Sequence, residues 1–147
     1  IGHAFGRIGC FCAGCCFGKI TDSFLGIVFP EGSSPYYYIV KHYVSEGMML
    51  EAAEELALST KVFPTQLFEA AFLFILAFTL HKLKHHQFEI YLISYGIFRF
   101  LLEFLRADDR GSLFGFFSPS RWLSIFIIIT GIISLLIEYK QKKSLQM

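Results

Sequence analysis

The chain of 147 residues is 54% hydrophobic and only 17% charged, and its mean hydropathy is +0.54. Ordinary soluble domains are about 25% charged, so this composition favours an integral membrane protein with room for three or four spans. The formal net charge of +1 comes with only short basic clusters, and we expect no nucleic-acid partner. The chain begins at Ile1 directly in a glycine-rich motif, without the basic region and cleavage site of a signal peptide, and we interpret it as part of a longer protein.

Residues 1–18 are moderately apolar and rich in glycine. Glycines at this density suit close backbone approach or positive φ angles better than a regular helix, so we expect the end of a membrane helix that breaks into a tight loop. The same segment holds all four cysteines of the chain: Cys10, Cys12, Cys15 and Cys16.

With no distant cysteine as a partner, these thiols can pair locally, bind something or stay reduced. Structural zinc sites normally use two separated pairs of ligands, and the adjacent Cys15 and Cys16 would point apart in regular backbone. We therefore favour packed small residues over a metal or iron–sulfur site, and we expect no metal and no cofactor.

Residues 19–61 have the composition of a loop. Pro30, Gly32 and Pro35 are turn-forming residues, and the tyrosines at 36–38 are typical of a membrane–water interface. Residues 47–60 are good helix formers with three glutamates, which favours a short amphipathic helix at the surface rather than a span. We predict a loop or arm outside the bilayer that carries one short helix.

Three apolar stretches follow, at residues 62–80, 88–106 and 121–138. About 20 apolar residues cross a bilayer, so we expect three transmembrane helices in residues 62–147, with a Lys-rich tail after the last. The lysines of the loop at 81–87 and of the tail share one side, which weakly favours a cytoplasmic tail. The predicted fold class is all-α: a polytopic membrane helix bundle with a loop or arm at 19–61, preceded by the segment 1–18.

The second apolar stretch carries Arg99, Glu103 and Arg106 at i, i+4 and i+7, with Tyr95 one turn before them and Arg110 one turn after. This spacing predicts one helix face with ionisable groups, which in a membrane usually faces a bundle interior or a wet cavity. The stripe is either a structural ion pair with Arg106 reaching to the interface, or an anion site open to a lipid headgroup. Arg99 lies roughly 16 Å along the predicted span at 1.5 Å per residue, too deep for easy snorkelling.

Two other segments offer polar groups. Arg7 lies in the glycine-rich segment, whose backbone N–H groups can also cradle phosphate oxygens. Gln66 and Glu69 are i, i+3 neighbours that open the first predicted span. They are either polar groups at a helix start or part of the same cavity as the arginine stripe.

Three ordered motifs carry a family resemblance: Gly6-Arg7-Ile8-Gly9-Cys10-Phe11 with Gly14 and Gly18; Pro64-Thr65-Gln66-Leu67-Phe68-Glu69; and Tyr95-Gly96-Ile97-Phe98-Arg99-Phe100 with Glu103, Phe104, Arg106 and Asp108. Together they resemble the C-terminal half of prolipoprotein diacylglyceryl transferase, over nearly the whole chain. The resemblance implies a multi-pass enzyme of the bacterial inner membrane, with the motif ends on the periplasmic side and the Lys-rich tail in the cytoplasm. It also implies two partners, phosphatidylglycerol and the lipobox cysteine of a prolipoprotein signal peptide; the enzyme moves the diacylglyceryl group of the lipid onto that thiol.

Carried over by position, Arg7 and Arg99 match the family's two key arginines, and we expect both, with Glu103, to be catalytic. The resemblance further implies that Arg7 and Arg99 also bind substrate, together with Arg106, Tyr95, Gln66 and Gly18. The chain departs from the family pattern where Cys10 and Ala13 stand in place of Asn and Cys15 in place of an acidic residue. It also lacks the family's His-Gly-Gly motif, for which His3 is only a weak stand-in, and we expect the 147-residue chain alone to be inactive. Two alternatives stay open: a non-catalytic relative that binds anionic lipid, and a thiol-based redox or metal membrane protein.

Overall fold

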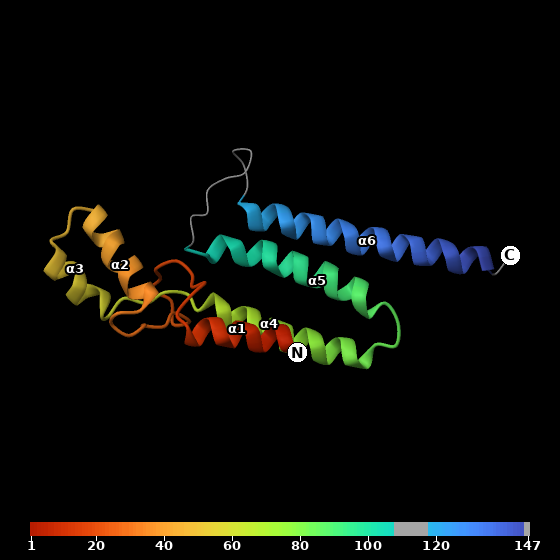
Figure 1. The fold of residues 1–147 in the computed structure, drawn as a ribbon, viewed down its shortest axis with the longest axis horizontal. Helices are drawn as coiled ribbons and strands as arrows, with labels where there is room; N and C mark the ends of the chain where they lie inside the picture. The colour runs from red at the N-terminus through yellow and green to blue at the C-terminus, as the bar shows by residue number, and fades with distance from the viewer. Residues whose placement is uncertain (108–117, 146–147) are drawn as a thin grey trace. The chain divides into compact units, whose positions relative to one another are not determined.

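The computed structural model describes residues 1–107 and 118–145, and over these residues the protein is all helical, as predicted. The elements in chain order are α1 (Gly2–Cys12), α2 (Ser34–Ser45), α3 (Leu50–Ala57), α4 (Thr65–Lys82), α5 (Gln87–Leu102), the 3-10 helix η1 (Glu103–Leu105) and α6 (Pro119–Leu145) (Figure 1). The chain forms two compact units. Of the described residues, one unit holds 2–70 and 105–107, and the other holds 71–104 and 118–145 together with Ile1.

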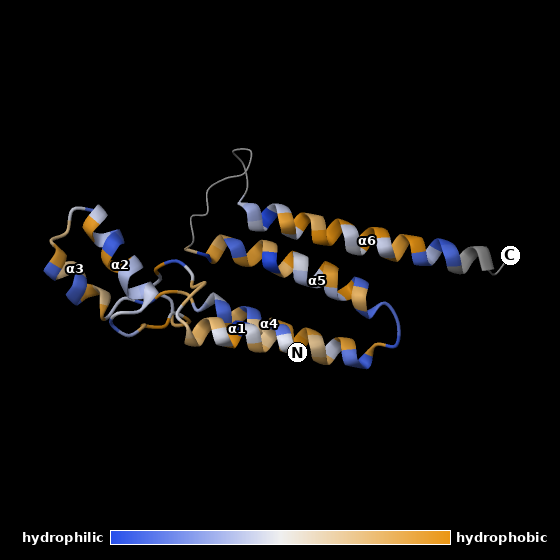
Figure 2. Cartoon of the chain, viewed as in Figure 1, coloured by the Kyte–Doolittle hydropathy of each residue, from blue (hydrophilic) through white to orange (hydrophobic). Residues whose placement is uncertain are grey.

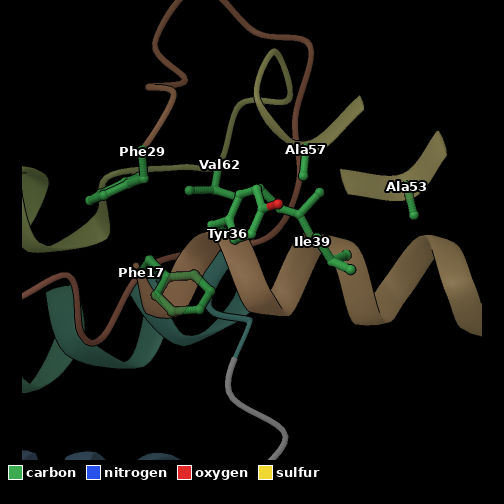
Figure 3. Close-up of a cluster of buried hydrophobic side chains, with 8 residues drawn as sticks. Phe17, Phe29, Tyr36, Ile39, Ala53, Ala57 and Val62 are labelled. Carbon is green, nitrogen blue, oxygen red and sulfur yellow. The ribbon is translucent and has the colours of Figure 1, made fainter. Parts of the chain in front are cut away.

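The first unit is built around a small apolar core (Figure 3). Tyr36 and Ile39 of α2 face Ala53 and Ala57 of α3, whose small side chains allow the two short helices to pack closely. Extended segments complete the core with Phe17, Phe29 and Val62. Val62 is fully buried and exchanges backbone hydrogen bonds of 3.0 Å with Ile27, so the segment before α4 is fixed by its backbone as well as by packing.

Helix α2 corrects the prediction of one short helix in residues 19–61. The tyrosines at 36–38 form part of this helix instead of a loop. The local signals for it are Ser33, whose side chain accepts a hydrogen bond from the Tyr36 N–H, and Pro35 in the first turn. The predicted helix at 47–60 is present as the shorter α3.

The glycines of residues 1–18 serve two purposes. Gly6 and Gly9 lie inside the regular helix α1, and a Cβ on either would meet nothing within 4 Å. Gly14 has φ +62° and turns the chain after the helix, while a Cβ on Gly18 would lie 2.6 Å from the Leu105 carbonyl oxygen. The expected helix end and tight loop are therefore present, but only the later glycines need their freedom.

In the second unit, α5 packs antiparallel against α6. Gly96 and Gly131 lie at this contact: a Cβ on Gly96 would be 2.6 Å from Ile128 Cγ1, and one on Gly131 would be 2.8 Å from Ile93 Cγ1. Glycines let helix backbones approach closely, so the two helices meet over most of the length of α5. At the far end of this contact, His86 Nδ1 lies 2.8 Å from a Glu138 oxygen.

Only one described helix, α6, contains a stretch long and apolar enough to cross a membrane, at Pro119–Gln141. Figure 2 shows its hydrophobic middle between more polar ends. The other two predicted spans are shorter or more polar: α5 has 16 residues, and the 18 residues of α4 include Gln66, Glu69 and Lys82. The structure thus supports an all-helical protein with one candidate span in its described part.

Candidate functional site

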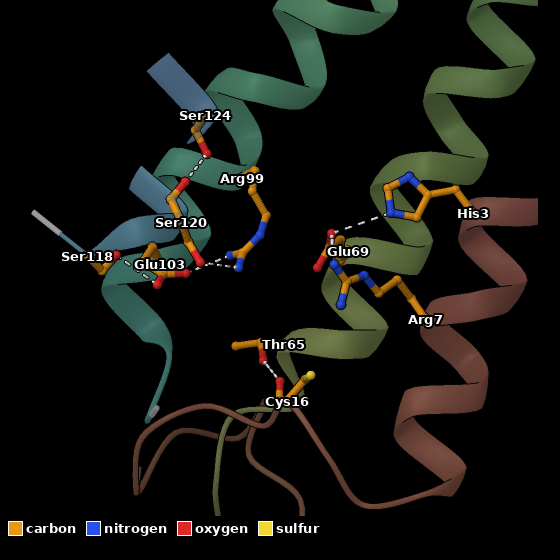
Figure 4. A network of polar contacts seen from close by, with 10 residues as sticks. All are labelled: His3, Arg7, Cys16, Thr65, Glu69, Arg99, Glu103, Ser118, Ser120 and Ser124. Atoms are coloured by element: carbon orange, nitrogen blue, oxygen red, sulfur yellow. Dashed lines mark hydrogen bonds and ion pairs between the residues drawn. The ribbon is translucent and has the colours of Figure 1, made fainter. Parts of the chain in front are cut away.

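Arg99 and Glu103 form a buried ion pair at the end of α5 (Figure 4). Arg99 Nη1 donates to Glu103 Oε2 at 2.8 Å, and the two side chains are 10% and 4% exposed. Two serines from the start of α6 complete the group: Arg99 Nη2 lies 3.3 Å from Ser120 Oγ, and Ser118 Oγ donates to Glu103 Oε1 at 2.9 Å. Ser120 is held in turn, because its carbonyl oxygen accepts a bond from Ser124 Oγ at 2.8 Å.

This geometry fixes the guanidinium plane of Arg99. Two of its nitrogens are bound by acceptors on different helices, so the side chain cannot rotate without breaking both bonds. A guanidinium has five N–H donors, and these contacts use two in the described part of the chain. The remaining donors suit a ligand with two adjacent oxygens, such as a phosphate.

The predicted stripe of Arg99, Glu103 and Arg106 on one helix face is wrong for its last member. The α-helix ends at Leu102, η1 follows, and Arg106 pairs with Gly18 in an isolated β-bridge. Its side chain is buried within the first unit, where the close approach of Gly18 to Leu105 and Phe63 fixes the backbone. The packing of Gly18 gives it a structural role here. Asp108 and Arg110 lie outside the described residues.

Arg7 has a carboxylate partner, Glu69, that the sequence analysis did not predict. Arg7 Nη2 lies 2.9 Å from Glu69 Oε1, and the side chains are 18% and 2% exposed. His3, one turn earlier on α1, places Nε2 at 4.0 Å from the same oxygen. The sequence analysis interpreted Gln66 and Glu69 either as polar groups at a helix start or as part of the arginine cavity, and Glu69 was not among the predicted site residues. The structure brings Glu69 to Arg7.

Gln66 binds the cysteine-rich loop. Its Nε2 donates to the Cys15 carbonyl oxygen, while Thr65 Oγ1 donates to the Cys16 carbonyl oxygen at 2.7 Å. Gln66 is 1% exposed, and its Oε1 has no hydrogen-bond partner within residues 1–107 and 118–145. A buried amide oxygen of this kind is an acceptor available to a ligand hydroxyl.

Tyr95 is half-buried one turn before Arg99, and its ring stacks on that of Tyr91 with centroids 5.8 Å apart. The predicted residues therefore fall into three groups. Arg99 pairs with Glu103, and Tyr95 lies on the same helix as Arg99. Arg7 contacts Glu69, which lies on α4 one turn after Gln66, and Gly18 pairs with Arg106. Arg99 and Arg7 belong to different units of the chain. Sequence reasoning missed Ser118 and Ser120, whose only local signal is their position before an apolar helix.

An all-helical fold with two arginines, each held by a buried carboxylate, defines a class of helical protein suited to an anionic ligand. Comparison with known proteins gives the particular class: the chain belongs to the prolipoprotein diacylglyceryl transferase family, whose profile matches residues 1–137.

Individual relatives agree with this assignment. A protein of Clostridium perfringens named phosphatidylglycerol--prolipoprotein diacylglyceryl transferase 2 is 39% identical over 139 residues, which cover 90% of this chain and 46% of the relative. A Clostridium tetani protein named phosphatidylglycerol--prolipoprotein diacylglyceryl transferase is 36% identical, over 90% of this chain and 47% of the relative. A Treponema denticola protein of the same name is 28% identical, over 99% of this chain and 52% of the relative. The chain spans about half the length of the curated relatives it matches.

Proposed function

We propose that this chain is the phosphate-binding half of a transferase that moves the diacylglyceryl group of phosphatidylglycerol onto the lipobox cysteine of a prolipoprotein. The observation that carries the proposal is the fixed guanidinium of Arg99, buried between Glu103 and Ser120. Membership of the family supplies the substrate class. The Arg7–Glu69 pair, in the other unit of the chain, offers a second guanidinium to an anionic oxygen.

The chemistry follows from charge. The thiolate of the prolipoprotein cysteine attacks the glyceryl carbon of the lipid, a carbon–sulfur bond forms, and the carbon–oxygen bond to phosphate breaks. The thiol proton leaves to a base or to water, and glycerol phosphate departs with one more negative charge than the phosphodiester had. A fixed arginine in a site shielded from water stabilises that growing charge without having to reorganise.

The other predicted residues have supporting parts in this proposal. Gln66 Oε1 offers a buried acceptor for a hydroxyl of the glycerol headgroup. Glu103 keeps Arg99 oriented, and we assign substrate binding to Tyr95 and Arg106 from their positions in the family motif. Gly18 acts through the backbone, because its close packing fixes the backbone segment that carries Arg106.

We also propose a multi-pass arrangement in the bacterial inner membrane, in which α4 and α5 join α6 as spans. The support is that four polar residues near the start of α4 and at the junction of α5 with η1 are buried, namely Gln66, Glu69, Arg99 and Glu103, while large apolar side chains such as Phe78, Ile97 and Phe126 are exposed. Polar groups inside and apolar groups outside suit a bundle in lipid. In this arrangement residues 1–18 end a membrane helix, residues 19–61 form a periplasmic arm, and residues 62–147 hold three spans with a cytoplasmic tail.

The test is complementation of a bacterial strain depleted of its own diacylglyceryl transferase. The complete gene that encodes this chain should restore growth, and the same gene with Arg99→Ala should not, with both proteins at equal levels in the membrane. Wild-type protein that fails to rescue although it is present in the membrane would refute the transferase. Retained binding of phosphatidylglycerol in that case would point to a non-catalytic lipid-binding relative.

The 147-residue chain by itself is expected to be inactive, since it spans about half of its relatives. A lipid-transfer assay with labelled prolipoprotein compares this chain with the complete gene product. Turnover by the short chain would show that residues 1–147 hold every group that the reaction needs.

A further inference from the structure

Three of the four cysteines form a cluster where α1 ends. The sulfur atoms of Cys10, Cys15 and Cys16 all lie within 4.8 Å of one another. All three side chains are half-buried, and no disulfide joins them. Cys12 is exposed and lies outside this cluster.

The backbone brings these sulfur atoms together by an unusual turn. Cys16 has φ +64°, a left-handed conformation that is uncommon for any residue except glycine. In regular backbone the side chains of adjacent residues point apart, but the left-handed turn at Cys16, directly after Cys15, places both sulfur atoms beside that of Cys10. The expectation of no metal rested partly on regular backbone at this point, and the left-handed turn removes that part of its basis.

The loop is held in this shape from outside. The carbonyl oxygens of Cys15 and Cys16 accept hydrogen bonds from Gln66 and Thr65, and the Cys15 N–H donates to the Cys10 carbonyl oxygen at 3.0 Å. The polar backbone groups are thereby satisfied without the thiols. Strained backbone of this kind persists where the surroundings enforce it, often at functional sites.

We propose that Cys10, Cys15 and Cys16 bind a thiophilic metal ion of the Zn²⁺ and Cd²⁺ type. Zn–S bonds of about 2.3 Å in tetrahedral geometry place sulfur atoms about 3.8 Å apart, so the cluster needs only a small contraction to close on the ion. Each thiol that binds gives up its proton to solvent, and a water molecule completes the fourth position. No oxidant is required, and no sulfur changes its oxidation state.

The bound ion would tie the end of α1 to the first turn of α4. Gln66 and Thr65 begin α4 and hold the cysteine loop, and Glu69 of the next turn holds Arg7. The bound metal therefore stabilises the position of the Arg7–Glu69 pair and takes no part in group transfer. Metal binding by the three cysteines does not depend on the proposed transferase activity.

The experiment titrates Cd²⁺ into the complete gene product, purified in detergent under a reductant that does not bind metal. We expect one ion per chain, the ultraviolet charge-transfer absorption of cadmium–thiolate bonds, and proton release measured in weakly buffered solution. Cys15→Ser and Cys16→Ser should each abolish the absorption. Cys12→Ser is the matched control and should leave it unchanged.

Three outcomes would overturn the proposal: no cadmium–thiolate absorption in the wild-type protein although Cys10, Cys15 and Cys16 are reduced, equal absorption in Cys15→Ser, or loss of absorption in Cys12→Ser. Isolation of the protein from anaerobically grown cells with two of the three cysteines joined as a disulfide would also contradict it. The wild-type stoichiometry and proton release do not rely on any variant, so a misfolded substitution cannot hide the answer. Lipid transfer is measured separately on the same preparations, and metal binding without transfer would refute the proposed function alone.

Discussion

Arg99→Lys is the most informative single change, because it keeps the positive charge and removes the planar fork. Arg99 reaches Glu103 at 2.8 Å and Ser120 at 3.3 Å from two different nitrogens, and a single ammonium cannot hold both while also facing a ligand. Arg99→Ala is less clean: removing one member of a buried ion pair costs about 3–5 kcal/mol of stability, so lost activity could reflect lost folding.

The expected magnitude comes from the missing donors. Loss of one oriented donor to the charge that develops in a transition state costs about 2.7–4 kcal/mol, or about 10²–10³ in rate. We expect Arg99→Lys to lower kcat/KM for lipid transfer by about 10², since the retained charge offsets part of the loss. The loss should fall mainly on kcat, because the departing phosphate is more negative than the bound lipid.

The assay follows transfer of a labelled diacylglyceryl group to a prolipoprotein peptide by the complete gene product in detergent. Arg121→Lys is a matched control: the Arg121 guanidinium lies 4.2 Å from the Phe104 ring centroid, and an ammonium preserves that cation–π contact. The control should change kcat/KM by less than about threefold. Near wild-type activity in Arg99→Lys, with a melting temperature close to that of the control, would refute the proposed role of the planar guanidinium of Arg99.

Other changes test separate parts of the structure. Glu69→Gln should lower lipid transfer and reduce the stability measured by thermal unfolding, by at most about 3–5 kcal/mol. The reason is that the Arg7 guanidinium, 2.9 Å from Glu69 Oε1, loses its buried counter-charge. Gly18→Ala should destabilise by about 1–3 kcal/mol, since the new Cβ would lie 2.6 Å from a carbonyl oxygen, whereas Gly6→Ala, with nothing within 4 Å, should be neutral or stabilising. Burial, with the neighbouring thiols, raises the pKa of Cys15 to about 11. The metal-free thiol should therefore alkylate slowly at pH 7 and faster as the pH rises toward 11. An alkylation rate that does not change over this range would contradict the buried environment of the thiol.

The apolar helices were predictable because their signal is local. The stretches at 62–80, 88–106 and 121–138 correspond to α4, α5 and α6 with shifts of a few residues at most ends, because a long run of apolar residues is itself the signal. Helix α2 was missed because its tyrosines and branched residues have weak helix propensity. Its packing on Ala53 and Ala57 of α3, which no local pattern reveals, outweighs that propensity.

Non-local contacts explain the remaining errors. Nothing between Arg99 and Arg106 resembles a helix stop, yet the α-helix ends at Leu102 because the chain must reach Gly18 for backbone pairing. The partner of Glu69 lies on α1, far away in sequence, and its role could not be read from the motif around it. The sequence analysis assumed regular backbone at Cys15 and Cys16, whereas Cys16 has φ +64°, because sequence alone does not indicate a left-handed residue at a cysteine.

The carboxylate beside each arginine has a consequence for the proposed reaction. A guanidinium buried alone would be costly, and the partners Glu103 and Glu69 keep each pair close to neutral while fixing its orientation. A neutral pair holds a singly charged phosphodiester only moderately, but its oriented donors interact more strongly with the phosphate monoester as the second charge develops. Binding that grows along the reaction lowers the barrier, whereas tight binding of the lipid itself would not. The paired arrangement therefore suits turnover better than two bare arginines, which would retain both the anionic lipid and the glycerol phosphate product.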